Sequence, residues 1–73
     1  MKHMQWIRDN YNVPAKRGAR IEFTDSTALF IMGFLYQPRR GTVVAARGGY
    51  LRVRFDNEKF IRNLHPKCNV RYL

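Results

Sequence analysis

The pattern of apolar and polar residues is clearest over residues 50–55, where the two kinds alternate. The apolar positions are Leu51, Val53 and Phe55. The positions between them hold Tyr50, Arg52 and Arg54. Because successive side chains of a strand point to opposite faces, this run predicts a strand with one apolar and one basic face. Residues 41–47 also favour a strand, and the Gly48-Gly49 pair between the two runs suits a tight hairpin turn.

Further strands are predicted on both sides of this hairpin. Residues 19–23 alternate between apolar and charged side chains, which is typical of a half-buried strand. Residues 59–64 form a fourth candidate, in which the adjacent Phe60 and Ile61 cannot both face inward, so the strand needs either a bulge or an exposed Phe60. Residues 65–69 are expected to form a single helical turn, and residues 70–73 a short last strand. The sequence therefore predicts a mainly β fold.

A short helix is predicted ahead of the strands. Met4, Ile7 and Tyr11 share one helical face, and the Val13-Pro14 pair ends the helix, because the residue before proline favours extended geometry. Trp6 either anchors this helix against the strands or offers its ring for stacking. We expect residues 1–15 to be an N-terminal arm with a short helix and residues 16–73 to be a β domain.

The segment 28–37 fits neither periodicity. Its first nine residues are nearly all apolar, so it is either a buried helix or a strand pair bent at Gly33. It must be covered by the protein's own core, by a second copy or by another protein. Nine residues are too few for the ~20 of a membrane-spanning helix, and we expect no membrane partner. The candidate interaction residues are Leu29, Phe30, Ile31, Phe34 and Tyr36.

The charge of the chain is unusual for its 73 residues, which suffice for one domain. The chain has fourteen basic and five acidic residues, which gives a net charge of +9, and ten of the basic residues are arginines. Guanidinium groups make bidentate contacts with phosphate and carboxylate. The charge favours nucleic acid or an acidic protein as the partner, and the alternative is a basic surface that only keeps the protein soluble. The basic residues fall in three clusters: Lys16, Arg17 and Arg20; Arg39 and Arg40; Arg47, Arg52 and Arg54.

The predicted order of elements resembles that of an SH3-like barrel over residues 16–73, and within that class the KOW and Tudor-type modules. The basic-glycine entry Lys16-Arg17-Gly18 and the Gly41 that opens the next strand match the KOW pattern. The resemblance implies a small five-stranded SH3-like barrel in which the entry strand and the hairpin are neighbours in one sheet. The three basic clusters would then merge into one face, with Tyr50 placed to stack on a base.

The chain also resembles small basic proteins encoded by bacteriophages and prophages. Residues 11–18, residues 49–56 and the turn Leu64-His65-Pro66 carry this resemblance. It implies the cytoplasm of a bacterial host cell and no particular activity. The amino end shows no secretion signal, and its two methionines leave a natural start at Met4 as an alternative to Met1.

Catalysis and metal binding find little support in the sequence. The acidic residues are scattered, and the closest two, Asp56 and Glu58, are expected in a solvated turn. His65 and Cys68 are spaced as a local metal pair, but a tetrahedral zinc site usually takes four ligands. We therefore expect no enzyme activity, no metal and no cofactor.

Two functions are left as hypotheses. The first is a non-catalytic module that binds RNA or DNA with weak sequence preference, because no recognition helix is apparent. Its candidate residues are Lys16, Arg17, Arg20, Arg39, Arg40, Arg47, Tyr50, Arg52 and Arg54. The second is a phage accessory protein that binds another protein or assembles with its own copies, as a homodimer, through residues 28–36.

Overall fold

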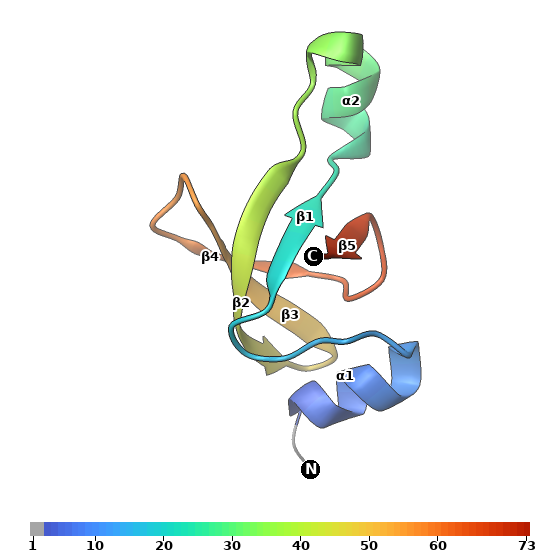
Figure 1. Cartoon of the computed structure of the whole chain (residues 1–73), viewed down its shortest axis with the longest axis vertical. Helices are drawn as coiled ribbons and strands as arrows, with labels where there is room; N and C mark the ends of the chain where they lie inside the picture. The colour runs from blue at the N-terminus through green and yellow to red at the C-terminus, as the bar shows by residue number, and fades with distance from the viewer. Residues whose placement is uncertain (1–2) are drawn as a thin grey trace.

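Five antiparallel strands form one sheet in the computed structural model, which describes residues 3–73 (Figure 1). The strands are β1 (Arg20–Phe23), β2 (Arg39–Arg47), β3 (Tyr50–Phe55), β4 (Ile61–Leu64) and β5 (Val70–Tyr72). They lie in the order β4-β3-β2-β1-β5, with β4 and β5 at the edges, so the sheet is not closed. The five strands confirm the predicted mainly β fold, but the sheet does not close into the predicted barrel. Met1 and Lys2, which precede the alternative start at Met4, lie outside the described residues.

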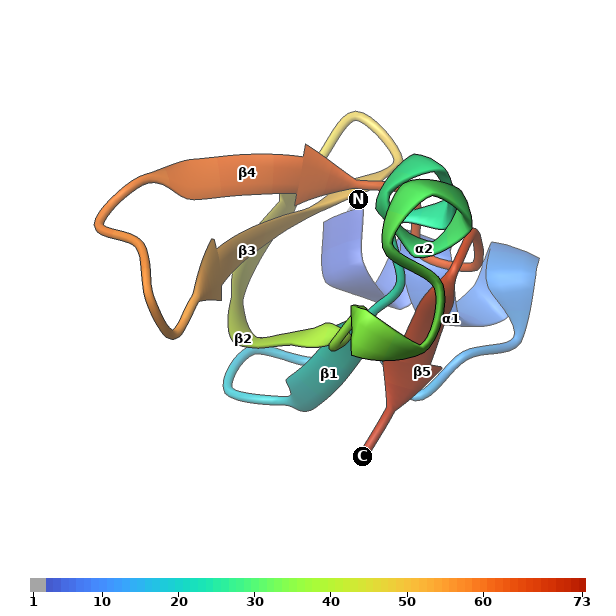
Figure 2. The same cartoon turned by 90° about the horizontal axis from the view of Figure 1, so that it is seen from above.

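The core lies on the inner face of this sheet, which curls so that β4 and β5 face each other across it (Figure 2). Its apolar residues include the predicted inward positions of β3, all of which are buried. The buried hydrophobic residues are Ile7, Ala15, Ile21, Val43, Leu51, Val53, Phe55 and Leu64. Two of them precede β1, so the N-terminal arm contributes directly to the core.

Helix α1 (His3–Tyr11) lies across the end of the sheet beside the hairpin turn (Figure 1). It confirms the predicted helix over residues 4–11 and buries Ile7 completely. Trp6 packs against the core and reaches the turn, where a Cβ added to Gly49 would lie 3.4 Å from the indole ring. Trp6 is therefore a packing anchor between the helix and the hairpin.

The predicted helical turn over residues 65–69 is wrong, because this segment is a series of bends. Its backbone groups are bonded in other ways. The backbone N–H of Lys67 donates to Nδ1 of His65 (3.1 Å), and the carbonyl of Asn69 accepts from the N–H of Thr24 (3.0 Å). Pro66 has no N–H to donate and is buried. Phe60, directly before β4, is exposed, which is one of the two alternatives that the adjacent Phe60 and Ile61 predicted.

The segment 28–37 is helical, which excludes the bent strand pair. Helix α2 (Ser26–Met32) begins after Asp25, whose carboxylate accepts from the backbone N–H groups of Thr27 and Ala28. It ends at Met32, and Gly33, whose φ is +59°, caps it and begins the one-turn 3-10 helix η1 (Gly33–Leu35).

Of the three alternatives for covering this segment, the protein's own core is excluded, because none of the residues of α2 and η1 is buried. The pairing of β1 with β2 ends at Phe23 and Arg39, so the chain between them leaves the end of the sheet. The helices therefore project beyond the core, away from α1 (Figure 1).

Candidate nucleic-acid interface

The side chains of β1, β2 and β3 that point away from the core form a surface that we call the outer face. The strand register sets its rows: Arg20 lies opposite Thr42, and Thr42 lies opposite Arg54. In the next row toward the hairpin turn, Ala45 lies opposite Arg52. The outer face comprises Arg20, Glu22, Arg40, Thr42, Ala45, Arg47, Tyr50, Arg52 and Arg54.

A bulge in β2 sets which side chains reach this face. The register shifts between Val43 and Ala45, so β2 carries one more residue than β3 at this point. Val43 stays buried, and Ala45 becomes the neighbour of Arg52.

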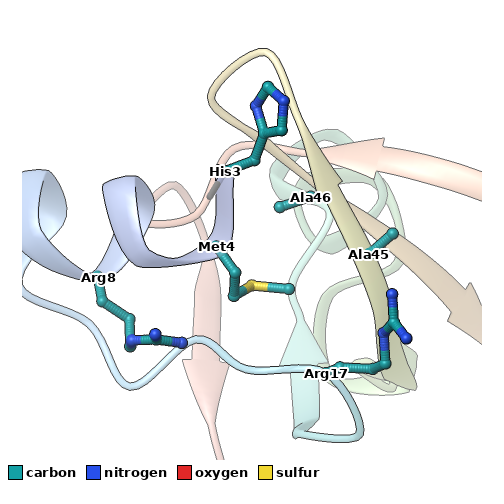
Figure 3. Close-up of a pocket in the computed structure, with 6 residues that line it drawn as sticks. All are labelled: His3, Met4, Arg8, Arg17, Ala45 and Ala46. Atoms are coloured by element: carbon teal, nitrogen blue, oxygen red, sulfur yellow. The ribbon is translucent and has the colours of Figure 1, made fainter. Parts of the chain in front are cut away.

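Arg17 joins this region from the turn before β1. Two backbone hydrogen bonds hold the turn against β2: Gly18 N–H to the Val43 carbonyl (2.8 Å) and Val43 N–H to the Ala19 carbonyl (2.9 Å). Arg17 consequently lies beside Ala45 at a shallow cavity of about 360 Å³ (Figure 3). The cavity is lined by His3, Met4, Arg8, Arg17, Ala45 and Ala46. Two guanidinium groups therefore border one hollow.

Acidic side chains occupy the other end of the outer face, near α2. Glu22 pairs with Arg40 (3.4 Å) and with Arg71 of β5 (3.2 Å). Asp56 accepts two hydrogen bonds from Arg20, of 2.7 and 2.6 Å. These bonds hold the pKa of Asp56 below its usual value and raise the pKa of Arg20. Arg20 and Arg40 are therefore already matched by carboxylates.

Arg39 lies on the opposite side of the sheet from Arg40, because neighbouring residues of a strand alternate between faces. Its guanidinium carbon lies 4.2 Å from the centroid of the Phe55 ring, a cation–π contact, and its Nη2 lies 2.9 Å from Glu58. Glu58 also accepts from Arg62 at 2.7 and 2.9 Å. Hydrogen bonds from Arg62 and then Arg39 lower the pKa of Glu58 to about 2. The three basic clusters therefore do not merge into a single face.

Of the remaining predicted basic residues on the strands, Arg54 lies in the same row as Arg20, and Arg52 and Arg47 lie closer to the hairpin turn. Within residues 3–73, no salt bridge joins an acidic side chain to Lys16, Arg17, Arg47, Arg52 or Arg54. Lys16 is exposed in the turn before β1. We call the other four arginines, together with Tyr50, the hairpin-end cluster: Arg17, Arg47, Tyr50, Arg52 and Arg54.

Four aromatic rings form a row that starts at Tyr50 of this cluster. Tyr50, which is half exposed, lies 6.3 Å from His65, and His65 lies 4.9 Å from Tyr11, measured between ring centroids. Tyr11 lies 5.9 Å from Trp6. All three contacts are edge-to-face, the arrangement that the ring quadrupole favours. Sequence reasoning missed Tyr11 and His65 as neighbours of Tyr50, because α1, β3 and the end of β4 meet only in the folded chain.

The candidate protein-interaction residues divide into two groups. Leu29, Phe30, Ile31 and Phe34 are exposed on α2 and η1. Tyr36 is half-buried, and its hydroxyl oxygen accepts from the backbone N–H of Asp25 at 2.6 Å. Tyr36 therefore closes the base of the projecting segment.

His65 and Cys68 make no metal site with a third ligand, since residues 3–73 contain no group of three side chains suited to holding a metal ion. His65 is engaged by the neighbouring rings and by Lys67 N–H, whereas Cys68 is exposed and free. Over the same residues, no helix has the length and apolar character that crossing a membrane requires.

Comparison of the chain with protein-family models, with curated proteins and with solved structures found no match.

Proposed function

We propose that the protein is a non-catalytic nucleic-acid-binding module whose hairpin-end cluster contacts the phosphate backbone. The observation that carries this proposal is the uneven distribution of charge over the outer face. Asp56 and Glu22 pair with Arg20 and Arg40, whereas the arginines of the hairpin-end cluster have no acidic partner among residues 3–73. A guanidinium group without a carboxylate partner is ready to bind phosphate, and one already paired must first exchange its partner.

Phosphate contacts give affinity without sequence information. Base readout requires side chains in a groove, and the outer face is a sheet surface that presents arginines rather than a recognition helix. The half-exposed Tyr50 at the border of the cluster adds a ring on which an unpaired base can stack. The module is therefore expected to bind RNA or DNA with weak sequence preference.

The order of elements supports the expected likeness to SH3-like modules. A strand, a long connection, a tight hairpin, a fourth strand and a last strand follow one another in the chain. The likeness to KOW-type and phage-encoded proteins stays a prediction. We place the protein in the cytoplasm of a bacterial host cell, because a chain with a single cysteine fits a reducing compartment.

The test is the affinity for labelled single-stranded RNA and duplex DNA, measured by fluorescence anisotropy. The variant Arg52→Glu/Arg54→Glu is expected to bind at least about tenfold more weakly, since each hydrogen bond to a charged group contributes about 1.5–3 kcal/mol. The control Lys59→Glu/Lys67→Glu changes the net charge equally but alters two turns instead of the outer face.

Equal losses in the two variants would mean that only the net charge matters, which would contradict a specific face. Binding that survives in a folded Arg52→Glu/Arg54→Glu variant would exclude the hairpin-end cluster. If the wild-type protein binds neither nucleic acid, an acidic protein becomes the candidate partner for the same arginines.

A further inference from the structure

We propose that the protein forms a homodimer through the projecting segment 29–35, which we call the apolar arm. It comprises the end of α2 and all of η1. The proposal does not depend on nucleic-acid binding, because the arm and the hairpin-end cluster share no residue.

The apolar arm exposes its largest side chains almost completely. Phe34 is 96% exposed, Phe30 89% and Ile31 75%. Leu35, Met32 and Leu29 are also exposed, so apolar surface surrounds the arm rather than forming one stripe. A helix that is apolar on all sides is normally buried, and a contiguous exposed apolar patch marks an interaction site.

The surface area of the whole molecule agrees with a missing subunit. A folded monomer of 8.7 kDa exposes about 4,700 Å² by the usual scaling of area with mass, whereas this chain exposes 5443 Å². The excess, about 700 Å², is close to the ~800 Å² that each partner buries in a standard-size protein interface. The molecule therefore exposes more surface than a compact monomer of its mass, by an amount comparable to one interface.

The distribution of charge favours a second copy as the occupant. The chain as a whole carries +9, so two copies repel each other over most of their surfaces. From Ser26 to Pro38 the sequence contains no charged residue. The arm is thus the part of the surface where two identical chains can meet without opposing arginines.

A lipid surface fits the arm less well. Helices that lie on membranes pair an apolar face with a strongly basic face, and α2 has no charged residue on any side. A helix without charge on any side instead fits enclosure by protein.

The base of the arm is held in place before any partner binds. The backbone N–H of Asp25 donates to the Tyr36 hydroxyl (2.6 Å), and Nδ2 of Asn69, just before β5, donates to Oγ of Ser26 (3.1 Å). Asp25 also caps α2. A preformed arm loses little conformational entropy on association, which strengthens the dimer.

The arm projects beyond one end of the sheet and the β2–β3 hairpin turn lies at the other end (Figure 1), in a molecule whose longest dimension is 41 Å. A dimer joined through two arms therefore leaves both clusters free at its far ends. Association and nucleic-acid binding are consequently separable by mutation.

The experiment is sedimentation equilibrium of the purified protein from about 1 to about 100 μM, a range that resolves micromolar dissociation constants. The wild-type mass is expected to rise from 8.7 kDa to twice that value. Phe30→Asp and Phe34→Asp, measured separately, are each expected to weaken association at least about tenfold, because a buried unpaired carboxylate is costly. Phe60→Asp is the matched control, since Phe60 is likewise an exposed phenylalanine, at 75%, but lies outside the arm.

Hydrogen exchange supplies a second readout that needs no variant. The amides of residues 29–35 are expected to become more protected as the concentration rises, while those of the turn 56–60 stay unchanged. Arg52→Glu/Arg54→Glu is expected to dimerise like the wild type, so failure of the nucleic-acid proposal would not affect this result. A wild-type protein that stays monomeric throughout, whether or not it binds lipid vesicles, would overturn the proposal. So would a Phe60→Asp variant that dissociates as readily as the two arm variants.

Discussion

Phe55 in β3 and Phe34 in η1 are the same type of residue, but one is buried and the other is exposed. Phe55 is 2% exposed and packs among the core residues, whereas Phe34 is 96% exposed. Strand pairing explains the difference: Phe55 lies opposite Gly41 inside the sheet, and Phe34 follows the point where β1 and β2 part. Hydrophobicity favours burial, but the length of the paired strands decides which apolar residues reach the core.

The same contrast holds for the charges of the sheet. Arg20 and Arg40 on the outer face are matched by Asp56 and Glu22, and the arginines of the hairpin-end cluster are not. The molecule therefore has three distinct regions: a core with a neutralised end, a basic end and an apolar arm. Substitutions can separate their roles.

The largest expected effect is the difference in the free energy of unfolding between two phenylalanine-to-alanine variants, one in the core and one in the arm. Phe55→Ala is expected to cost about 3–5 kcal/mol of the free energy of unfolding, because it removes a buried ring and leaves a cavity. Phe34→Ala is expected to change it by no more than about 0.5 kcal/mol in the monomer, since the ring touches no core residue. Urea unfolding at a concentration where the chain is monomeric measures both.

Equal costs for the two alanine variants would contradict the comparison, because they would place the arm inside the cooperative core. A loss in Phe34→Ala that appears only at high protein concentration would instead report the dimer.

A medium effect on stability is expected at Gly41, a residue of β2 that is paired with β1 on one side and with β3 on the other. A Cβ at this position would lie 2.8 Å from the Arg54 carbonyl oxygen and 3.1 Å from the Phe55 Cα, both backbone atoms that cannot swing aside. Gly41→Ala is therefore expected to destabilise the fold by about 1–3 kcal/mol, as overpacking usually does. Thermal unfolding checks this value, and an unchanged midpoint would mean that the sheet adjusts more freely than this packing implies.

The smallest effect concerns the ion pairs of Glu58 on the core side of the sheet. Its pKa is lowered from 4.5 to about 2, chiefly by the hydrogen bonds from Arg62 and Arg39. The folded state thus binds this proton less readily than the unfolded chain, so the pairs stabilise the fold above about pH 4.5 and lose this effect as the pH falls toward 2.

Glu58→Gln provides the measurement for this pair. Its unfolding temperature is expected to lie below that of the wild type at neutral pH, and the gap is expected to shrink as the pH falls from 4.5 to 2. A gap that does not depend on pH would show that the charge of Glu58 does not contribute.

The sequence predicted the elements whose signals are local. Alternation in residues 50–55, the Gly48-Gly49 turn and the face shared by Met4 and Ile7 depend on neighbours in the chain, and all were found in the structure. Alternation also implies that the adjacent residues Arg39 and Arg40 lie on opposite faces, a consequence that the clustering by sequence overlooked.

The parts that sequence reasoning missed depend on tertiary geometry. The place where β1 and β2 separate decides that the segment 28–37 leaves the core, and no local pattern marks that place. The pairing of Arg20 with Asp56 joins residues 36 positions apart, and the row from Trp6 to Tyr50 needs three elements to meet. The bends at residues 65–69 depend on Asn69 bonding to Thr24.

The most direct test of the proposed basic end is the salt dependence of nucleic-acid binding. Four arginines without acidic partners predict that log K falls with log salt concentration with a slope of about −3 to −4, since each neutralised phosphate contributes about 0.7 to 0.9. Arg52→Glu/Arg54→Glu is expected to flatten this slope, and Lys59→Glu/Lys67→Glu is expected to leave it nearly unchanged. The absence of saturable binding by the wild-type protein at about 50 mM salt, where phosphate contacts are strong, would contradict the account.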